Sequence, residues 1–247
     1  MPKKSSERFI ELDILRGFAI SYMILLHILW DLDYFKIVKL DMTIYQTNII
    51  VQVMFFTLLG VCLAISYDKN KNRSKKKVYL HLIDRGCWVF ILGMILTIIT
   101  ALFMPERPIL FGVLHCIGFC IILSIPFLKL KHWNLPIATI MIVLGVILGS
   151  YNVSNPTALH LLIGLRPIDF WTNTIDYFPI FPWVGVCLLG VAMGSVLYKD
   201  KKRKFIMPDL TKYKPARFLS WLGQHSLIIY LAHQPVITGV LVLYLFF

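Results

Sequence analysis

The chain has 247 residues, of which 58% are apolar and only 15% are charged. This composition excludes an ordinary soluble globule, because apolar stretches of about 18 residues or more recur and are long enough to cross the ~30 Å hydrocarbon core of a bilayer. The formal net charge is +12 at pH 7, but the cations lie in the connections between the apolar stretches. We therefore interpret them as topology signals and do not expect a nucleic-acid partner.

Seven apolar segments are predicted to cross the membrane, so the expected fold class is all-α, a polytopic membrane helix bundle. In chain order they are residues 9–31, 48–67, 83–103, 109–128, 135–150, 180–198 and 218–246. No small-residue cleavage site follows the first segment, which favours a permanent span over a signal peptide. Residues 1–247 are expected to form a single integral membrane domain in contact with the lipid bilayer.

The lysine and arginine residues fall mainly into alternate connections between these spans. Twenty of the 25 share one side, because they precede the first span or lie in 69–85, 129–131 and 199–217. Four lie on the other side: Lys36, Lys39, Arg107 and Arg166. Since cytoplasmic loops carry an excess of Lys and Arg, this predicts a cytoplasmic N-terminus and, with seven spans, an extracytoplasmic C-terminus. The expected location is the plasma membrane of a prokaryote.

Two basic runs stand out among these cations, at 75–77 and 201–204. They are interpreted as anchors attracted to the head groups of anionic lipids on the cytoplasmic side. The alternative is that one of them also steers an anionic cofactor from the cytosol.

Two further features concern packing and the outer face. The extracytoplasmic connection 151–179 is too long and polar for a simple turn, and we expect a re-entrant or interfacial element that roofs a cavity. Small residues four apart, at Gly145 and Gly149 and at Gly190 and Gly194, predict close helix contacts. These contacts could lie within one chain or between two, so a homo-oligomer is an open alternative.

The first span carries two charged residues and an imidazole, which are costly in hydrocarbon and therefore tend to face the bundle interior and mark sites. Arg16 and His27 are eleven residues apart, which returns to within ~20° of the same helix face and separates them by ~16.5 Å. One groove could therefore meet both. Asp13 precedes Arg16 by three residues, so the two can pair and orient the guanidinium.

Further histidines interrupt other spans: His115 lies in the fourth span, and His225 and His233 in the last. At ~1.5 Å per residue, His225 is level with Arg16, whereas His115, His233 and His27 share the outer third of the membrane. One such histidine alone could simply bond a backbone carbonyl, but three at one depth favour a shared site. A metal site is the competing interpretation, but no H-x-x-x-H spacing supports it and no metal is expected.

Four stretches of the chain together resemble the catalytic-domain family of heparan-alpha-glucosaminide N-acetyltransferase, within the transmembrane acyltransferase superfamily. They are ELDILRG at 11–17, FGVLHCIG at 111–118, DYFPIFPWVG at 176–185 and LGQHSLIIYLAHQP at 222–235. The resemblance spans nearly the whole chain in order. The spacing of Arg16 and His27 is also similar to the first-helix motif of transmembrane acyltransferases that O-acetylate surface glycans.

The resemblance implies one acyltransferase domain over 1–247. It would take acetyl-CoA from the cytosol and acetylate an amine or hydroxyl of a glycan-type acceptor on the opposite side. The eukaryotic lysosomal enzyme holds its catalytic histidine in the loop after the first span, whereas residues 31–46 contain no histidine. His27 is therefore the expected general base, because a neutral imidazole can take a proton from the attacking acceptor.

The donor, acetyl-CoA, is expected to bind toward the cytoplasmic side. Arg16, oriented by Asp13, would contact its phosphates or its polar arm. Arg85 and His225 are the expected helpers there.

The acceptor is expected near the outer third of the membrane. His115 or His233 would donate to the developing oxyanion or orient the acceptor. Candidate acceptor-binding residues are Asp176, Trp171 and Gln234. Trp171 and Tyr177 could also belong to an interfacial aromatic belt, and the belt is the favoured interpretation. Direct transfer is preferred to a covalent intermediate.

Two other classes of protein compete with an acyltransferase. In a proton-coupled transporter or flippase, the same buried His and Arg side chains would relay protons or bind an anion. No inverted repeat relates the two halves of the sequence, which disfavours this alternative. A membrane scaffold without chemistry would leave the polar residues of three spans unexplained.

Overall fold

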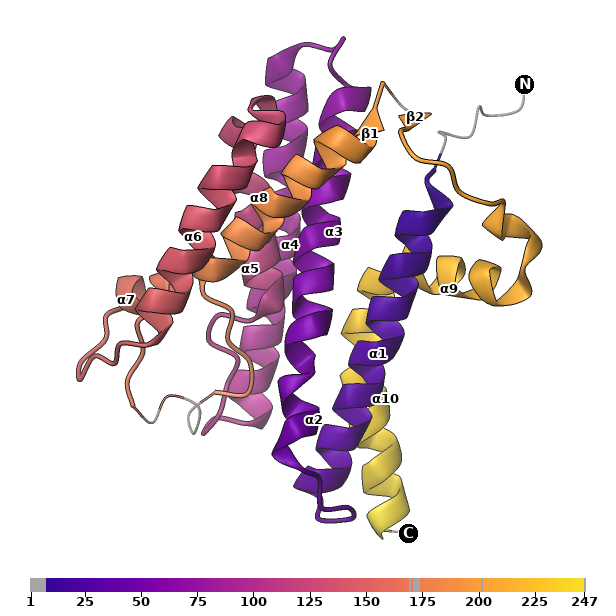
Figure 1. The fold of residues 1–247 in the computed structure, drawn as a ribbon. Coiled ribbons are helices and arrows are strands. Elements are labelled where there is room, and N and C mark those ends of the chain that lie inside the picture. The colour runs from indigo at the N-terminus through magenta and orange to yellow at the C-terminus, as the bar shows by residue number, and fades with distance from the viewer. Residues whose placement is uncertain (1–7, 169, 171–173, 201, 247) are drawn as a thin grey trace. The chain divides into compact units, whose positions relative to one another are not determined.

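The computed structural model describes residues 8–168, 170, 174–200 and 202–246 (Figure 1). In this part of the chain the only strands are a short antiparallel pair, β1 (Tyr198–Lys199) and β2 (Lys202–Arg203). The rest of the regular structure is helical. The chain divides into two compact units. Unit 1 comprises Met1–Leu58 and Ile206–Phe247, and unit 2 comprises Leu59–Phe205.

Six of the described helices are long and apolar enough to cross a membrane, which confirms an all-α, polytopic integral membrane protein. They are α1 (Ile10–Tyr34), α3 (Asn48–Lys69), α4 (Lys75–Phe103), α6 (Asn134–Gly149) with the preceding 3-10 turn η2 (Lys131–Trp133), α8 (Ile180–Leu197) and α10 (Ser226–Phe246). The helix α4 begins at Lys75 and not at 83 as predicted, so the basic run 75–77 is helical.

The fourth predicted span, 109–128, contains only a short α-helix, α5 (Val113–Leu123), followed by the 3-10 helix η1 (Ile125–Lys129). The 11 residues of α5 rise ~16.5 Å, or half of the hydrocarbon thickness. Pro126 explains the break, because proline lacks the N–H that the next α-helical turn would donate. A seventh crossing, formed by α5 and η1 together, therefore remains a prediction.

The prediction of residues 218–246 as one helix is wrong. The segment divides into α9 (Lys214–Gln224) and α10, and His225 caps the end of α9. Gln224, His225 and Ser226 form a polar triplet at this junction, and an amphipathic helix precedes it. His225 therefore lies at the junction of two helices and not inside a continuous span.

In unit 1, α1 and α9 cross at a contact between their backbones. A Cβ on Gly17 would lie 1.8 Å from the carbonyl oxygen of Leu219, and a Cβ on Gly223 would lie 1.8 Å from that of Asp13. No residue other than glycine fits at either position without moving a helix. Beyond the crossing, α10 runs along α1 toward the C-terminus (Figure 1), and an apolar core around Ile20 lies in the same unit.

In unit 2, small residues again allow helices to approach closely. The helices α6 and α8 pack together where a Cβ on Gly145 would lie 2.4 Å from the backbone nitrogen of Pro182. Gly86 of α4 and Gly118 of α5 face each other in the same way. Gly149 meets nothing within 4 Å, so only one end of this predicted small-residue motif makes a close contact.

The connection 151–179 contains the short helix α7 (Ala158–Ile163), and its re-entrant or interfacial character stays a prediction. Tyr177 is only 5% exposed, and its ring centroid lies 4.6 Å from that of Phe170. A place for Tyr177 in an interfacial aromatic belt is therefore wrong, because its ring packs inside unit 2. The remaining short elements are α2 (Met42–Gln46) and η4 (Leu210–Lys212).

Candidate functional site

The helix α1 carries the predicted donor-binding pair near one of its ends. Nη1 of Arg16 donates to Oδ1 of Asp13 over 2.9 Å, which confirms the predicted contact. The backbone of Asp13 contacts Gly223, three residues before α10 begins. Arg16 is therefore level with the start of α10, near an end of the membrane-spanning segment and not at its middle.

His27 of α1 and His233 of α10 lie together, as their similar predicted depth implies. Their ring centroids are 4.8 Å apart in an edge-to-face arrangement. Nδ1 of His233 bonds the backbone carbonyl of Tyr230. Since a carbonyl only accepts, this Nδ1 carries a proton, and Nε2 of the neutral ring is an acceptor. Within the part of the chain that the structure describes, His27 makes no hydrogen bond, so its nitrogens are available to a substrate.

Asp31 and Gln234 extend this pair of histidines. Asp31 is 2% exposed and follows His27 by one helical turn on the same face. Nε2 of Gln234 donates to both carboxylate oxygens of Asp31, over 3.0 and 3.1 Å. Asp31 is absent from the predicted site residues because the predicted span ends there, where a charge is ordinary. The four-residue spacing of Asp31 from His27, which places both on one helix face, is the sequence signal that could have identified it. We call His27, Asp31, His233 and Gln234 the α1–α10 cluster.

Two buried acceptor atoms of the α1–α10 cluster lack a hydrogen-bond partner among the described residues. They are Nε2 of His233 and Oε1 of Gln234. Leaving a buried polar atom unpaired costs ~1–3 kcal/mol, and a ligand with N–H or O–H groups would satisfy both atoms. The cluster is therefore suited to hold an amine or a hydroxyl next to His27, which can take its proton.

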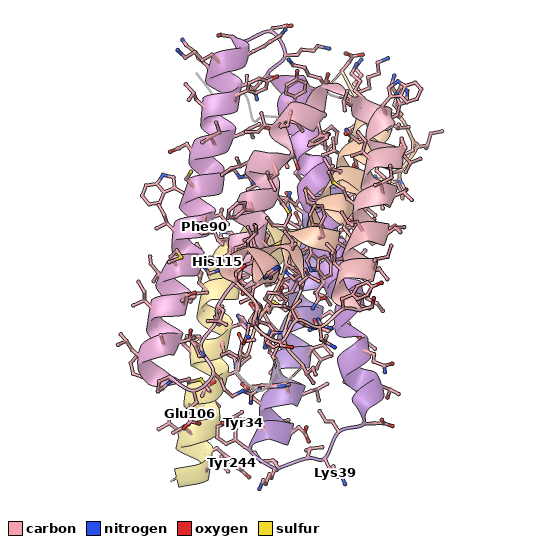
Figure 2. All side chains as sticks on the ribbon, turned by 90° about the vertical axis from the view of Figure 1, so that its left-hand side faces the viewer. Tyr34, Lys39, Phe90, Glu106, His115 and Tyr244 are labelled. Atoms are coloured by element: carbon pink, nitrogen blue, oxygen red, sulfur yellow. The ribbon has the colours of Figure 1, made fainter. Side chains whose placement is uncertain are left out.

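His115 lies in unit 2, and its predicted place beside His27 and His233 stays a prediction. Its ring lies beside Phe90 (Figure 2) in an edge-to-face arrangement, with 5.1 Å between centroids. It also stacks on Phe111, with 5.4 Å between centroids. A Cβ on Gly93 would lie 2.9 Å from the ring. We call these four residues the α5 cluster. The side chain is 1% exposed, which is the environment of a packed core residue.

The hydrogen bond of His115 determines which of its ring nitrogens carries the proton. Nδ1 accepts from the backbone N–H of Gly112 over 3.2 Å, so the neutral ring carries its proton on Nε2. This Nε2 is buried without a partner among the described residues. His115 thus presents an unpaired donor, whereas His233 presents an unpaired acceptor.

Asp176 supports the α5 cluster from the connection that precedes α8. Its Oδ2 accepts from the backbone N–H of Val113 over 3.1 Å, at the first residue of α5. A carboxylate is stabilising at the N-terminus of a helix because it faces the positive end of the helix dipole. Burial raises the pKa of Asp176 to about 6, against the opposing effect of hydrogen bonds from the backbone N–H groups of Val113 and Tyr177. An acceptor-binding role for Asp176 stays a prediction.

The structure gives less support to the remaining predicted residues. His225 is exposed at the end of α9, with its ring centroid 4.8 Å from that of Trp221. Arg85 is exposed on α4. Trp171 lies outside the described residues. No group of three or more His, Cys, Asp or Glu side chains in the described ranges could hold a metal ion.

Comparison with known families gives a match over most of the chain. A family model described as "Heparan-alpha-glucosaminide N-acetyltransferase, catalytic" matches residues 8–235. The matched range contains every residue of both clusters and confirms the predicted resemblance. No curated protein and no solved structure matches the chain.

Proposed function

The chain belongs to the heparan-alpha-glucosaminide N-acetyltransferase catalytic family, and we propose that it moves an acetyl group from cytosolic acetyl-CoA to an amine or hydroxyl of a glycan-type acceptor on the extracytoplasmic side. The observation that carries this proposal is the α1–α10 cluster, in which His27 lies beside two unpaired buried acceptor atoms. Because the family match extends across both units, we treat residues 1–247 as one acyltransferase domain.

The α1–α10 cluster supports a direct transfer. The acceptor would donate N–H or O–H hydrogen bonds to Nε2 of His233 and Oε1 of Gln234. Neutral His27 then takes the proton as the acceptor nitrogen or oxygen attacks the thioester carbonyl. The carbon–sulfur bond breaks, and the CoA thiolate leaves as a thiol after taking the proton from His27. The carboxylate of Asp31 favours the transient positive charge on the imidazole.

The donor end of the reaction is proposed at Arg16. Its guanidinium, held by Asp13, would bind the phosphates or the polar arm of CoA, with Arg85 and His225 as helpers. Because α1 is continuous from Ile10 to Tyr34, Arg16 and His27 are ~16.5 Å apart along its axis, which suits an extended pantetheine arm. His115 offers an N–H donor, the polarity that an oxyanion requires.

The proposed orientation has the N-terminus in the cytoplasm and the C-terminus outside, in the plasma membrane of a prokaryote. If α5 and η1 together did not cross the membrane, the connection 199–217 with its eight basic residues would lie outside the cell. That placement would go against the positive-inside rule. A reporter fused after Lys77 is expected in the cytoplasm, and one fused after Phe247 outside. Finding both on one side would rule out seven crossings.

The transfer itself is tested with purified protein in lipid nanodiscs, acetyl-CoA labelled in its acetyl group and crude envelope glycans. The wild type should transfer label and His27→Gln should transfer far less, whereas His132→Gln, at an exposed position in η2, should behave as the wild type. Acetyl-CoA should also raise the melting temperature by mass action, which neither a transporter nor a scaffold predicts. Absence of both transfer and stabilisation would contradict the proposal.

A further inference from the structure

A polar hollow of about 490 Å³ lies in unit 2, where the end of α3 meets the start of α4. This volume falls within the ~300–1,000 Å³ typical of ligand pockets. Three stretches of chain supply its polar lining: Ser66 of α3, then Asn70, Arg73 and Ser74 of the turn, and Lys77 and His81 of α4. None of these residues belongs to either histidine cluster.

Helical spacing explains why these side chains converge. Ser74, Lys77 and His81 recur at intervals of three and four residues, so they share one face of the first turns of α4. Val78 and Leu82, on the same side of the helix, also line the hollow and are 8% and 1% exposed. The early start of α4 at Lys75 is what places the basic side chains in this register.

The hollow is lined by cations and by no carboxylate. Arg73, Lys77 and His81 make no hydrogen bond or ion pair through their side chains within the described ranges. The carboxylates of Asp68 and Asp200, near this turn, pair with Lys71 instead, over 3.5 Å and 2.6 Å. Two unpaired cations beside a polar hollow create a positive potential that attracts anions.

We propose that this hollow binds a phosphate group. A guanidinium such as that of Arg73 bonds phosphate oxygens in a fork, and the ammonium of Lys77 adds a point charge. The hydroxyl of Ser74 and the imidazole of His81 can donate further hydrogen bonds. The phosphate belongs either to a nucleotide or to the head group of an anionic lipid. The nucleotide source rests on the proposed function, since CoA ends in a 3′-phosphorylated ADP.

The test compares two double variants that remove the same charge from the same turn. Arg73→Gln with Lys77→Gln changes the lining, whereas Lys75→Gln with Lys76→Gln changes neighbouring exposed cations that do not line the hollow. All four positions are exposed, so both variants should keep the melting temperature of the wild type. The probes are 3′,5′-ADP, measured by calorimetry in phosphatidylcholine nanodiscs, and phosphatidylglycerol, measured by its retention in native mass spectrometry.

The variant Arg73→Gln with Lys77→Gln should lose at least tenfold in affinity for one of the two probes. The control, Lys75→Gln with Lys76→Gln, should keep the affinity of the wild type. Loss of 3′,5′-ADP identifies a nucleotide site, and loss of phosphatidylglycerol alone identifies a lipid head-group site. Equal binding by both variants, or no binding of either probe by the wild type, would overturn the proposal. Because no acetyl group or acceptor is present, this result does not depend on whether the protein transfers acetyl groups.

Discussion

In the α1–α10 cluster a histidine stays partly accessible beside polar side chains, whereas in the α5 cluster a histidine is enclosed by aromatic rings. His27 makes no hydrogen bond within the described residues and contacts the edge of His233. His115 is 1% exposed between Phe90 and Phe111. The depth predicted from sequence does not separate these two situations. What separates them is which groups surround the ring and which ring nitrogen is already occupied.

The two clusters also differ in the unpaired atom that each presents. His233 is left with an acceptor because a carbonyl holds its Nδ1 proton, and His115 is left with a donor because a backbone N–H occupies its Nδ1. An acceptor suits a substrate amine or hydroxyl, and a donor suits a developing negative charge. A backbone contact at Nδ1 thus decides whether the other ring nitrogen of a neutral histidine is a donor or an acceptor.

The largest effect is expected from His27→Gln. This substitution keeps roughly the side-chain volume but removes the titrating nitrogen, so acetyl transfer should fall by ~10²–10⁴-fold, as is typical for lost general base catalysis. The melting temperature should change little, because His27 makes no hydrogen bond within the described chain. Turnover and melting temperature are measured on one preparation. A less stable but fully active variant would mean that His27 only packs.

A larger loss of stability is expected from His115→Ala. Removing an enclosed ring leaves a cavity and should cost ~3 kcal/mol of folding free energy. The drop in melting temperature should therefore exceed that of His27→Gln, when both are measured in the same detergent. A His115→Ala protein as stable as the wild type would remove the distinction between the clusters.

A smaller effect is expected from separating Asp31 and Gln234. Asp31→Ala leaves the amide of Gln234 without its acceptor, and Gln234→Ala leaves the buried carboxylate without its donor. A double-mutant cycle should give a coupling free energy of ~0.5–3 kcal/mol. Strict additivity would show that this hydrogen-bonded pair does not stabilise the α1–α10 cluster.

The smallest effect concerns Asp176, which supports the α5 cluster. Its pKa in the fold is raised from 3.8 to about 6, so the fold favours the protonated carboxyl. The resulting stability is fully present below pH 3.8 and is lost as the pH rises through 6. Melting temperatures between pH 4 and pH 7 should therefore fall more for the wild type than for Asp176→Asn. Parallel curves would contradict the raised pKa.

Several features of unit 1 are predictable from sequence because they depend on one helix. The contact of Asp13 with Arg16 follows from their three-residue spacing. The contact of His27 with His233 agrees with the depths counted from residues 9 and 218. That count works although α10 begins only at Ser226, because α9 crosses α1 at Gly17 and Gly223, each ten residues before its histidine.

Other features escape prediction because they depend on a break or on tertiary packing. The polar triplet at 224–226 separates α9 from α10. In the sequence it lies within a long, mainly apolar stretch, so the prediction joins the two helices into one. Pro126 shortens α5 in the same way. The enclosure of His115 requires Phe90 from another helix, and no spacing within one segment indicates that contact.

The close contact of α1 with α9 at Gly17 and Gly223 determines the position of His233 along α1. Gly17 precedes His27 by ten residues of unbroken helix, a rise of ~15 Å. Gly223 determines where the chain turns into α10 beside α1. If α10 were displaced by one turn, ~5.4 Å, His233 would lie opposite Met23 or Asp31 instead of His27. Two residues without side chains therefore determine, from ten residues away, which ring lies against His27.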